Sequence, residues 1–214
     1  MDIEIIKGEL DQLKSELQVT ETAHKILTGL LGMLEEQLTI PVVVKAFIMI
    51  EQIQKFREYL DYVERHYNNV QRAWKLINDK CGNGFRFISD DYVWGMIDQN
   101  VKNHDLSKLS KEEFTQYRQF FFPTQNEVKD KEQFKSAWEN HKNENAHHWQ
   151  NWTVNFKDNP YADIFLVENI VDWVAMGFEF NDTAKAYYEK NKEDIKLPDW
   201  AVEEMYKIFD CIYP

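Results

Sequence analysis

The 214-residue chain contains few of the residues that build turn-rich or covalently cross-linked folds. It has 7 glycines and 5 prolines, which leaves little room for the many tight turns of a β-sandwich or barrel. Its two cysteines, Cys81 and Cys211, belong to no CxxC motif and are too few for a disulfide framework. Because long stretches also show helical spacing, we expect an almost entirely α-helical protein in a reducing compartment.

The chain also lacks an excess of positive charge and a long apolar run. Its formal net charge of −12 argues against binding to a nucleic-acid backbone, because such affinity comes mainly from clustered lysine and arginine side chains. The stretch IPVVVKAFIMI is interrupted by Lys45 and is too short to span a membrane, and the first ten residues do not resemble a signal peptide. We therefore expect a cytoplasmic protein that does not associate with membranes.

The first 40 residues follow a pattern of their own. Ten positions from Ile6 to Leu38 alternate in steps of four and three, and eight of the ten are apolar. This spacing is typical of a coiled coil that joins copies of the chain or binds a partner, although an amphipathic helix packed on its own domain has similar spacing. His24 lies on the apolar seam, where a polar residue commonly sets the register. We expect a homo-oligomer formed through residues 1–40.

Residues 41–214 are expected to form one helical domain. Pro41 suits the first turn of a helix that ends near Asn78, and CGNGFRFISDD is then the clearest break, with room for a short hairpin or loop. Ser89 or Asp90 can cap the next helix, which ends near His104. Ser110 and Glu113 fit a capping box for a helix over 111–122. Further helices are predicted over 130–156, 161–177, 182–191 and 199–211.

Within this domain, histidines and aspartates recur on several predicted helices. They are His66, His104, Asp105, His141, His147, His148 and Asp172. Imidazole and carboxylate groups brought together by folding are the ligands that a divalent metal needs to activate water. The alternative is that these residues have structural roles only. His104 and Asp105 would then be an ordinary histidine and capping aspartate at a helix end, and the histidines at 141, 147 and 148 would lie on a solvated polar face.

The spacing of these residues restricts how they can meet. Adjacent residues on a helix diverge by about 100°, so His104 and Asp105 can serve one metal only at a chain end, or can bridge two metals. On a continuous helix His141 and His148 would lie about 10 Å apart, which suits two neighbouring metals or a break near 143–145. Asp172 stands in an apolar stretch with Glu168 one turn earlier, so either or both carboxylates can face the site.

The order of these residues resembles that of a known superfamily. HYNNVQRAW, NHDLSK and IVDWVAM are similar to three signatures of the HD-domain metal-dependent phosphohydrolases, and the resemblance covers roughly residues 56–180. HKNENAHHW resembles the additional histidines of the two-metal members. The runs HDLSKLSKEEFTQYRQFFFP and DWVAMGF also resemble a related, uncharacterised group of bacterial and phage proteins. An HD-like helical bundle is therefore the expected architecture.

The resemblance also implies roles for individual residues. One metal would be held by His66, His104, Asp105 and Asp172. A second would recruit His141 and one or both of His147 and His148. Asp105 would bridge the metals and help to orient the attacking water, and Lys108 would contact a substrate phosphate. Mixed imidazole and carboxylate ligation suits one or two ions of manganese, iron, cobalt, nickel or zinc.

The expected activity is hydrolysis of a small phosphorylated molecule, with a nucleotide as one candidate. Two alternatives stay open: a di-iron oxygenase on the same ligands, and a non-catalytic metal-binding or scaffold protein that acts through its N-terminal helix. The chain has no glycine-rich phosphate loop, dinucleotide fingerprint or serine or cysteine nucleophile motif, so substrate choice must come from side chains near the metal. Candidates are Lys108, Lys102, Arg118, Tyr117 and Trp149.

Overall fold

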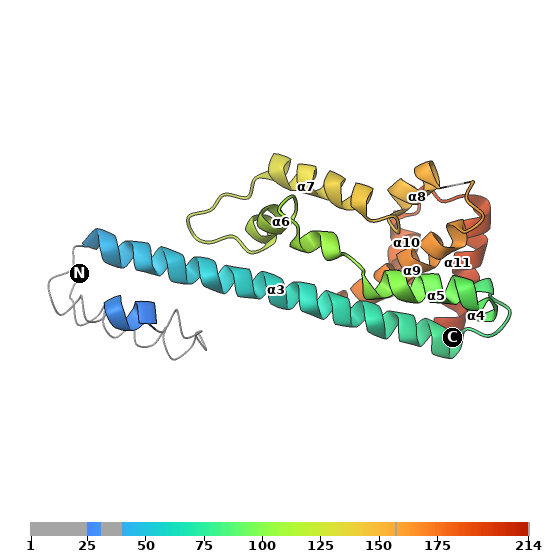
Figure 1. The fold of residues 1–214 in the computed structure, drawn as a ribbon. Coiled ribbons are helices and arrows are strands. Elements are labelled where there is room, and N and C mark those ends of the chain that lie inside the picture. Colours follow the sequence, from blue (N-terminus) through green and yellow to red (C-terminus); the bar gives the residue numbers. More distant parts are fainter. Residues whose placement is uncertain (1–24, 31–39, 157, 214) are drawn as a thin grey trace. The chain divides into compact units, whose positions relative to one another are not determined.

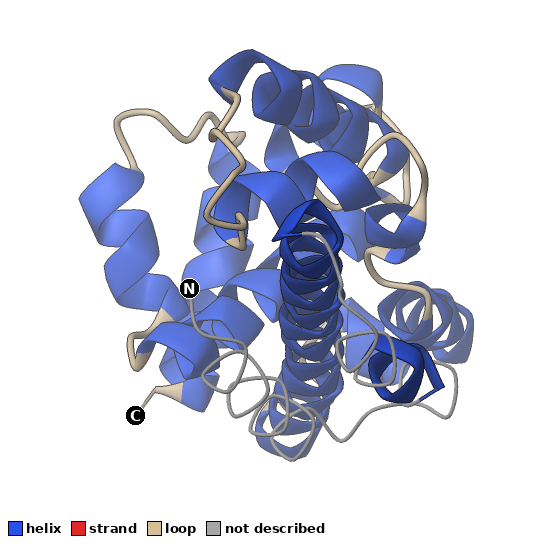
Figure 2. Ribbon diagram, turned by 90° about the vertical axis from the view of Figure 1, so that its left-hand side faces the viewer, coloured by secondary structure: helices blue, strands red, loops and turns tan. Residues whose placement is uncertain are grey.

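The computed structural model describes residues 25–30, 40–156 and 158–213. Within these ranges the chain forms helices, turns and loops and no strand (Figure 2), which confirms the predicted all-α class. The predicted coiled coil over 1–40 lies mostly outside the described residues. Within that segment, residues 25–30 are described, and they are helical. None of the described helices is both long enough and apolar enough to cross a membrane.

The chain divides into two compact units, residues 1–58 with 124–126, and residues 59–123 with 127–214. The long helix α3 (Ile40–Lys80) contributes to both. In the first unit, Val43, Ala46 and Ile50 of α3 are buried. The backbone N–H of Gln125 also donates a 2.7 Å hydrogen bond to the side chain of Glu51. All of the candidate metal ligands belong to the second unit.

The second unit is a bundle of helices (Figure 1). After α3 the elements are α4 (Arg86–Ser89), α5 (Asp91–Lys102), η1 (Leu106–Leu109), α6 (Phe114–Phe121), α7 (Lys131–Glu144), α8 (Trp149–Asn155), α9 (Ala162–Phe180), α10 (Ala184–Asn191) and α11 (Asp199–Ile212). Val70, Ala73 and Ile77 of α3 are completely buried in its core. An aspartate cap starts α5 as predicted, since Asp90 accepts hydrogen bonds from the two backbone N–H groups that follow Asp91.

Helix α9 lies at the centre of this bundle. Helices α4, α5, α8, α10 and α11 all pack against it. Its sequence is apolar around most of its circumference, and a helix with that pattern is stable when it is covered on all sides. The helix ends at Phe180, because Asn181 adopts the left-handed conformation that commonly terminates a helix. Burial of α9 takes two of its four carboxylates, Glu168 and Asp172, into the interior of the bundle.

The observed helices differ from the prediction in three places. The predicted helix over 130–156 is two helices, α7 and α8, separated by residues 145–148. The predicted helix over 111–122 begins later, at Phe114, and the side chain of Glu113 does not cap it. The expected hairpin or loop after α3 contains the one-turn helix α4. The first two differences have the same cause, since residues in both segments contact the candidate metal centre.

Candidate metal centre

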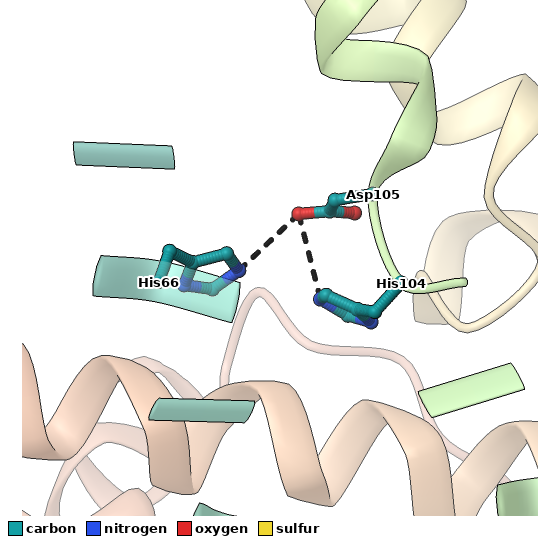
Figure 3. Close-up of side chains that lie close together, drawn as sticks. All are labelled: His66, His104 and Asp105. Carbon is teal, nitrogen blue, oxygen red and sulfur yellow. Dashed lines mark ion pairs between the residues drawn. The ribbon is translucent and has the colours of Figure 1, made fainter. Parts of the chain in front are cut away.

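The predicted ligands converge from five parts of the second unit. His66 comes from α3, His104 and Asp105 from the turn after α5, and Asp172 from α9. The others are His141 on α7 and His147 and His148 in the loop between α7 and α8. Five of the seven are buried, and the side chain of Asp172 is only 13% exposed. Figure 3 shows one carboxylate oxygen of Asp105 paired with the rings of both His66 and His104.

The turn after α5 explains how two adjacent residues face one centre. Asp105 has φ 56° and ψ 25°, which is left-handed backbone. Few residues other than glycine tolerate this conformation, and aspartate is among those that do, because its short side chain bonds locally. The backbone carbonyl of Asp105 then accepts a 3.0 Å hydrogen bond from the N–H of Lys108, which starts η1. The helix end therefore lets His104 and Asp105 point inward together.

The first group of ligands surrounds one carboxylate oxygen. Asp105 Oδ2 lies 3.2 Å from His66 Nε2 and 3.4 Å from His104 Nε2. Asp172 Oδ1 lies 3.4 Å and 3.6 Å from the same two nitrogens. Ligand atoms held at about 2.1 Å from one ion are separated by roughly 3.0–3.4 Å. These distances match that spacing better than a hydrogen bond near 2.9 Å.

A second group faces the other oxygen of the same carboxylate. Asp105 Oδ1 lies 3.4 Å from His141 Nε2 and 3.5 Å from His147 Nε2. His148 offers a ligand atom that lies within 4.8 Å of those of Asp105 and His141. Asp105 therefore stands between two groups of imidazoles, with one oxygen directed at each. The break between α7 and α8 is what brings both His147 and His148 to this centre.

Several atoms of the two groups lack a hydrogen-bond partner. They are Nε2 of His66, His104, His147 and His148, and Oδ1 of Asp105. Each buried polar atom left unsatisfied costs about 1–3 kcal/mol. A divalent cation would accept a lone pair from each of them, so the residues present fit a metal centre.

Glu168 contacts the Nδ1 atoms of two of the histidines. Its Oε1 lies 3.4 Å from His104 Nδ1 and 3.2 Å from His147 Nδ1. Its Oε2 accepts a 3.1 Å hydrogen bond from Asn100. A carboxylate on Nδ1 keeps the proton there and leaves Nε2 free to bind a metal. Of the α9 carboxylates Glu168 and Asp172, Asp172 therefore faces the ligand atoms and Glu168 orients two of the histidines.

Glu113 has the same role for His141, and sequence reasoning missed it. The buried Glu113 side chain lies with Oε2 2.8 Å from His141 Nδ1, while Oε1 accepts a 2.9 Å hydrogen bond from Asn140. The sequence pattern marked Glu113 as a capping residue because Ser110 precedes it by three positions. The partner lies 28 residues away, a separation that no local pattern detects.

The charged groups of the centre shift one another's pKa values. Burial raises the pKa of Asp105, but His104 and Lys108 more than offset this and hold that pKa well below its usual range. Burial lowers the pKa of His104, yet Asp105, Asp172 and Glu168 together raise it to about 10. Burial likewise opposes the ionisation of Glu168, while His147 and His104 bring its pKa down to about 2. The carboxylates are therefore ionised at neutral pH, as metal ligation requires.

Lys108 lies directly beside the bridging carboxylate. Its Nζ is buried, 2.7 Å from Asp105 Oδ2 and 5.6 Å from the centre of the Tyr62 ring. The carbonyl of Lys108 accepts a 3.1 Å hydrogen bond from the hydroxyl of Tyr59. Burial alone would lower the pKa of Lys108, but Asp105 and the neighbouring acids raise it, so the side chain is a fixed positive charge.

A pocket of 320 Å³ opens onto these residues. Its lining includes His66, Asp105, Lys108, His141, His148 and Asp172. Of the candidates for substrate contact, Lys108 and Tyr117 line the pocket. The other three lie elsewhere: Lys102 pairs with Asp98, Arg118 pairs with Glu127, and Trp149 packs against the main core.

Comparison with known proteins places the chain in a family. It belongs to a family of unknown function (DUF5662), whose model matches residues 55–210. The matched segment contains all seven predicted ligands and both carboxylates that orient them, Glu113 and Glu168. Searches of curated proteins and of solved structures give no match.

Proposed function

We propose that this protein is a metal-dependent hydrolase of phosphoesters whose centre holds two divalent ions. The observation that carries the proposal is the position of Asp105. Its two oxygens face two groups of buried imidazoles, at 3.2–3.4 Å on one side and 3.4–3.5 Å on the other, and His147 of the second group also lies near His104 and Asp172 of the first. A carboxylate shared in this way can hold two ions at a fixed separation. The resemblance to the HD-domain phosphohydrolases supports the same chemistry.

The ligand set suits a transition metal. It combines imidazole nitrogens and carboxylate oxygens without a thiolate, which is compatible with manganese, iron, cobalt, nickel or zinc. When bound, such a pair of ions would lower the pKa of water and offset the negative charge that grows on a phosphoryl group. This local positive charge would allow a protein with a net charge of −12 to accept an anionic substrate.

The chain's own side chains then have separate roles. Asp105 and Asp172 would hold the ions, and Glu113 and Glu168 would keep the imidazoles in the tautomer that binds metal. Lys108 lines the pocket 2.7 Å from Asp105, where its charge favours a phosphate oxygen beside the ions.

Metal analysis is the first test. The full chain, purified without chelator, is expected to contain close to two transition-metal ions, and His104→Ala is expected to lose at least one of them. His24→Ala removes the one histidine outside the ligand set and serves as the matched control. A wild-type chain without stoichiometric metal, or a His104→Ala variant with unchanged content, would refute the metal centre.

Activity is the second test. The metal-loaded chain is expected to release inorganic phosphate from phosphate monoesters in the presence of Mn²⁺ or Ni²⁺, and Asp105→Asn is expected to abolish the release. If the iron-loaded chain instead consumes oxygen in a substrate-dependent reaction, the oxygenase alternative replaces the hydrolase. Stoichiometric metal without either reaction would favour the non-catalytic alternative.

A further inference from the structure

The outer part of the pocket is aromatic. Its walls include Phe121, Phe134, Trp138, Trp173, Phe180 and Tyr187. Three of these are unusually exposed for large apolar side chains: Phe121 at 48%, Phe180 at 69% and Tyr187 at 45%. Exposed apolar side chains that gather at one hollow commonly mark the place where a ligand buries them. The pocket is thus suited to an apolar body that lies next to the metal centre.

The part of this pocket that the structure describes has no free positive charge for a second anionic group of the ligand. Among the described residues that line it, Lys108 is the single lysine or arginine, and Asp105 already occupies its ammonium at 2.7 Å. The exposed Asp182 adds negative charge to the lining. A ligand with one anionic group can place that group at the ions, whereas a second phosphate or a carboxylate farther out would lack a positive partner.

Tyr117 supplies one polar contact within the aromatic walls. The residue is 5% exposed and lines the pocket, and its hydroxyl is buried without a hydrogen-bond partner. A buried hydroxyl without a partner is unfavourable unless a ligand or a water molecule completes it. This unpartnered hydroxyl is a second observation, beside the exposed aromatic residues, that indicates an occupant of the pocket.

We propose that the pocket binds a phosphate monoester whose alcohol part is an uncharged aromatic ring system. The ring lies between the aromatic walls, a polar atom of the ring system or the ester oxygen bonds to Tyr117, and the phosphate lies beside Lys108 and the ions. In the reaction, the oxygen of water bonds to phosphorus, the P–O ester bond breaks, and the alcohol leaves with one proton from that water. This inference names the substrate class of the proposed hydrolase and rests on it.

Ligand affinity tests the inference without relying on turnover. The Mn²⁺-loaded full chain is titrated calorimetrically with 1-naphthylmethylphosphonate and with methylphosphonate, which carry the same charged group and are not hydrolysed. Burial of the ring is expected to give at least about tenfold tighter binding. Phe180→Ala should reduce this ring preference several-fold, whereas Val154→Ala, an equally exposed control at 69% on α8, should not change it.

A second variant tests the polar contact with Tyr117. Two phosphate esters then show whether the substrate class or the hydrolase activity itself is refuted. Tyr117→Phe should weaken binding of 6-hydroxy-2-naphthyl phosphonate, whose ring carries a polar atom. The variant's metal content, and its affinity for 1-naphthylmethylphosphonate, which has neither a polar ring atom nor an ester oxygen, should stay at the wild-type level. Equal affinity for the naphthyl and methyl compounds, or no binding of either, would overturn the substrate class even if simple esters are hydrolysed. A clear ring preference in a chain that hydrolyses neither naphthyl phosphate nor glycerol phosphate would refute the hydrolase and support the ligand class of the pocket.

Discussion

Nδ1 of His141 lies 2.8 Å from Oε2 of Glu113, and both side chains are buried. An ionised carboxylate can only accept a hydrogen bond, so the imidazole carries its proton on Nδ1. The lone pair of Nε2 is then free on the side that faces Asp105 Oδ1, 3.4 Å away. Glu113 is therefore a positioning residue that prepares His141 for a metal it does not itself contact.

Replacing Glu113 with glutamine should weaken metal binding by His141. A neutral amide can also donate to Nδ1, which would move the imidazole proton to Nε2 and block the ligand atom. We expect metal affinity at the His141 side to fall by about 10–100-fold, with the other ion retained. Calorimetric titration with Mn²⁺ measures both affinities, and Glu112→Gln, at an exposed position, is the control. Two ions bound with wild-type affinity in Glu113→Gln would exclude this role.

Replacing Asp105 and replacing Asp172 should remove different numbers of metal ions. Asp105 faces both groups of imidazoles, so Asp105→Asn is expected to lose both ions. Asparagine tolerates the left-handed backbone at this position, and the fold should persist. Asp172 lies near His66 and His104, so Asp172→Asn is expected to lose chiefly one ion. Metal content after dialysis, with circular dichroism as a check of folding, measures the difference; equal losses in both variants would contradict a shared carboxylate.

Metal uptake should release protons. Burial lowers the pKa of His104, but Asp105, Asp172 and Glu168 raise it to about 10 in the metal-free chain, so its imidazole is protonated at neutral pH. A metal must displace that proton, and its affinity should therefore rise with pH up to about 10, by about tenfold per unit for one proton. Titration at pH 7 in two buffers with different ionisation enthalpies measures the number released. A binding heat that is the same in both buffers would show that no proton is displaced.

Most of the fold could be predicted from local sequence patterns. The helix with the uniformly apolar sequence, α9, was expected over 161–177 and is observed over Ala162–Phe180. Asp90 was one of two expected caps and has that role. For 130–156 the sequence left two interpretations, one continuous helix or a break near 143–145. The break is observed: α7 ends at Glu144, and His147 and His148 then turn toward Asp105. Tertiary contacts decide such a break, and no period in the sequence shows it.

Only part of the candidate site could be predicted from the sequence, for a related reason. Ligand types such as histidine and aspartate are recognisable one residue at a time, and all seven lie at the centre. Glu113 differs from an ordinary surface glutamate only through a partner that lies 28 residues away. Glu168 could be recognised from its apolar stretch, but its role could not, because its partner His104 lies 64 residues away. The aromatic walls of the pocket were equally hidden, since aromatic residues at helical spacing predict a core as readily as a pocket.

Gly177 should be essential for the connection between α9 and α10. A Cβ atom at this position would lie 2.7 Å from the backbone oxygen of Asp182, and the N–H of Asp182 donates a 2.9 Å hydrogen bond to the Gly177 carbonyl. Gly177→Ala must therefore shift the backbone, and we expect it to lower the free energy of unfolding by about 1–3 kcal/mol despite alanine's better helix propensity. Gly95→Ala on α5 meets open space and should raise it by about 0.5–1 kcal/mol. Urea unfolding of the metal-free chain measures both, and a Gly177→Ala variant as stable as Gly95→Ala would show that the close approach carries no energetic cost.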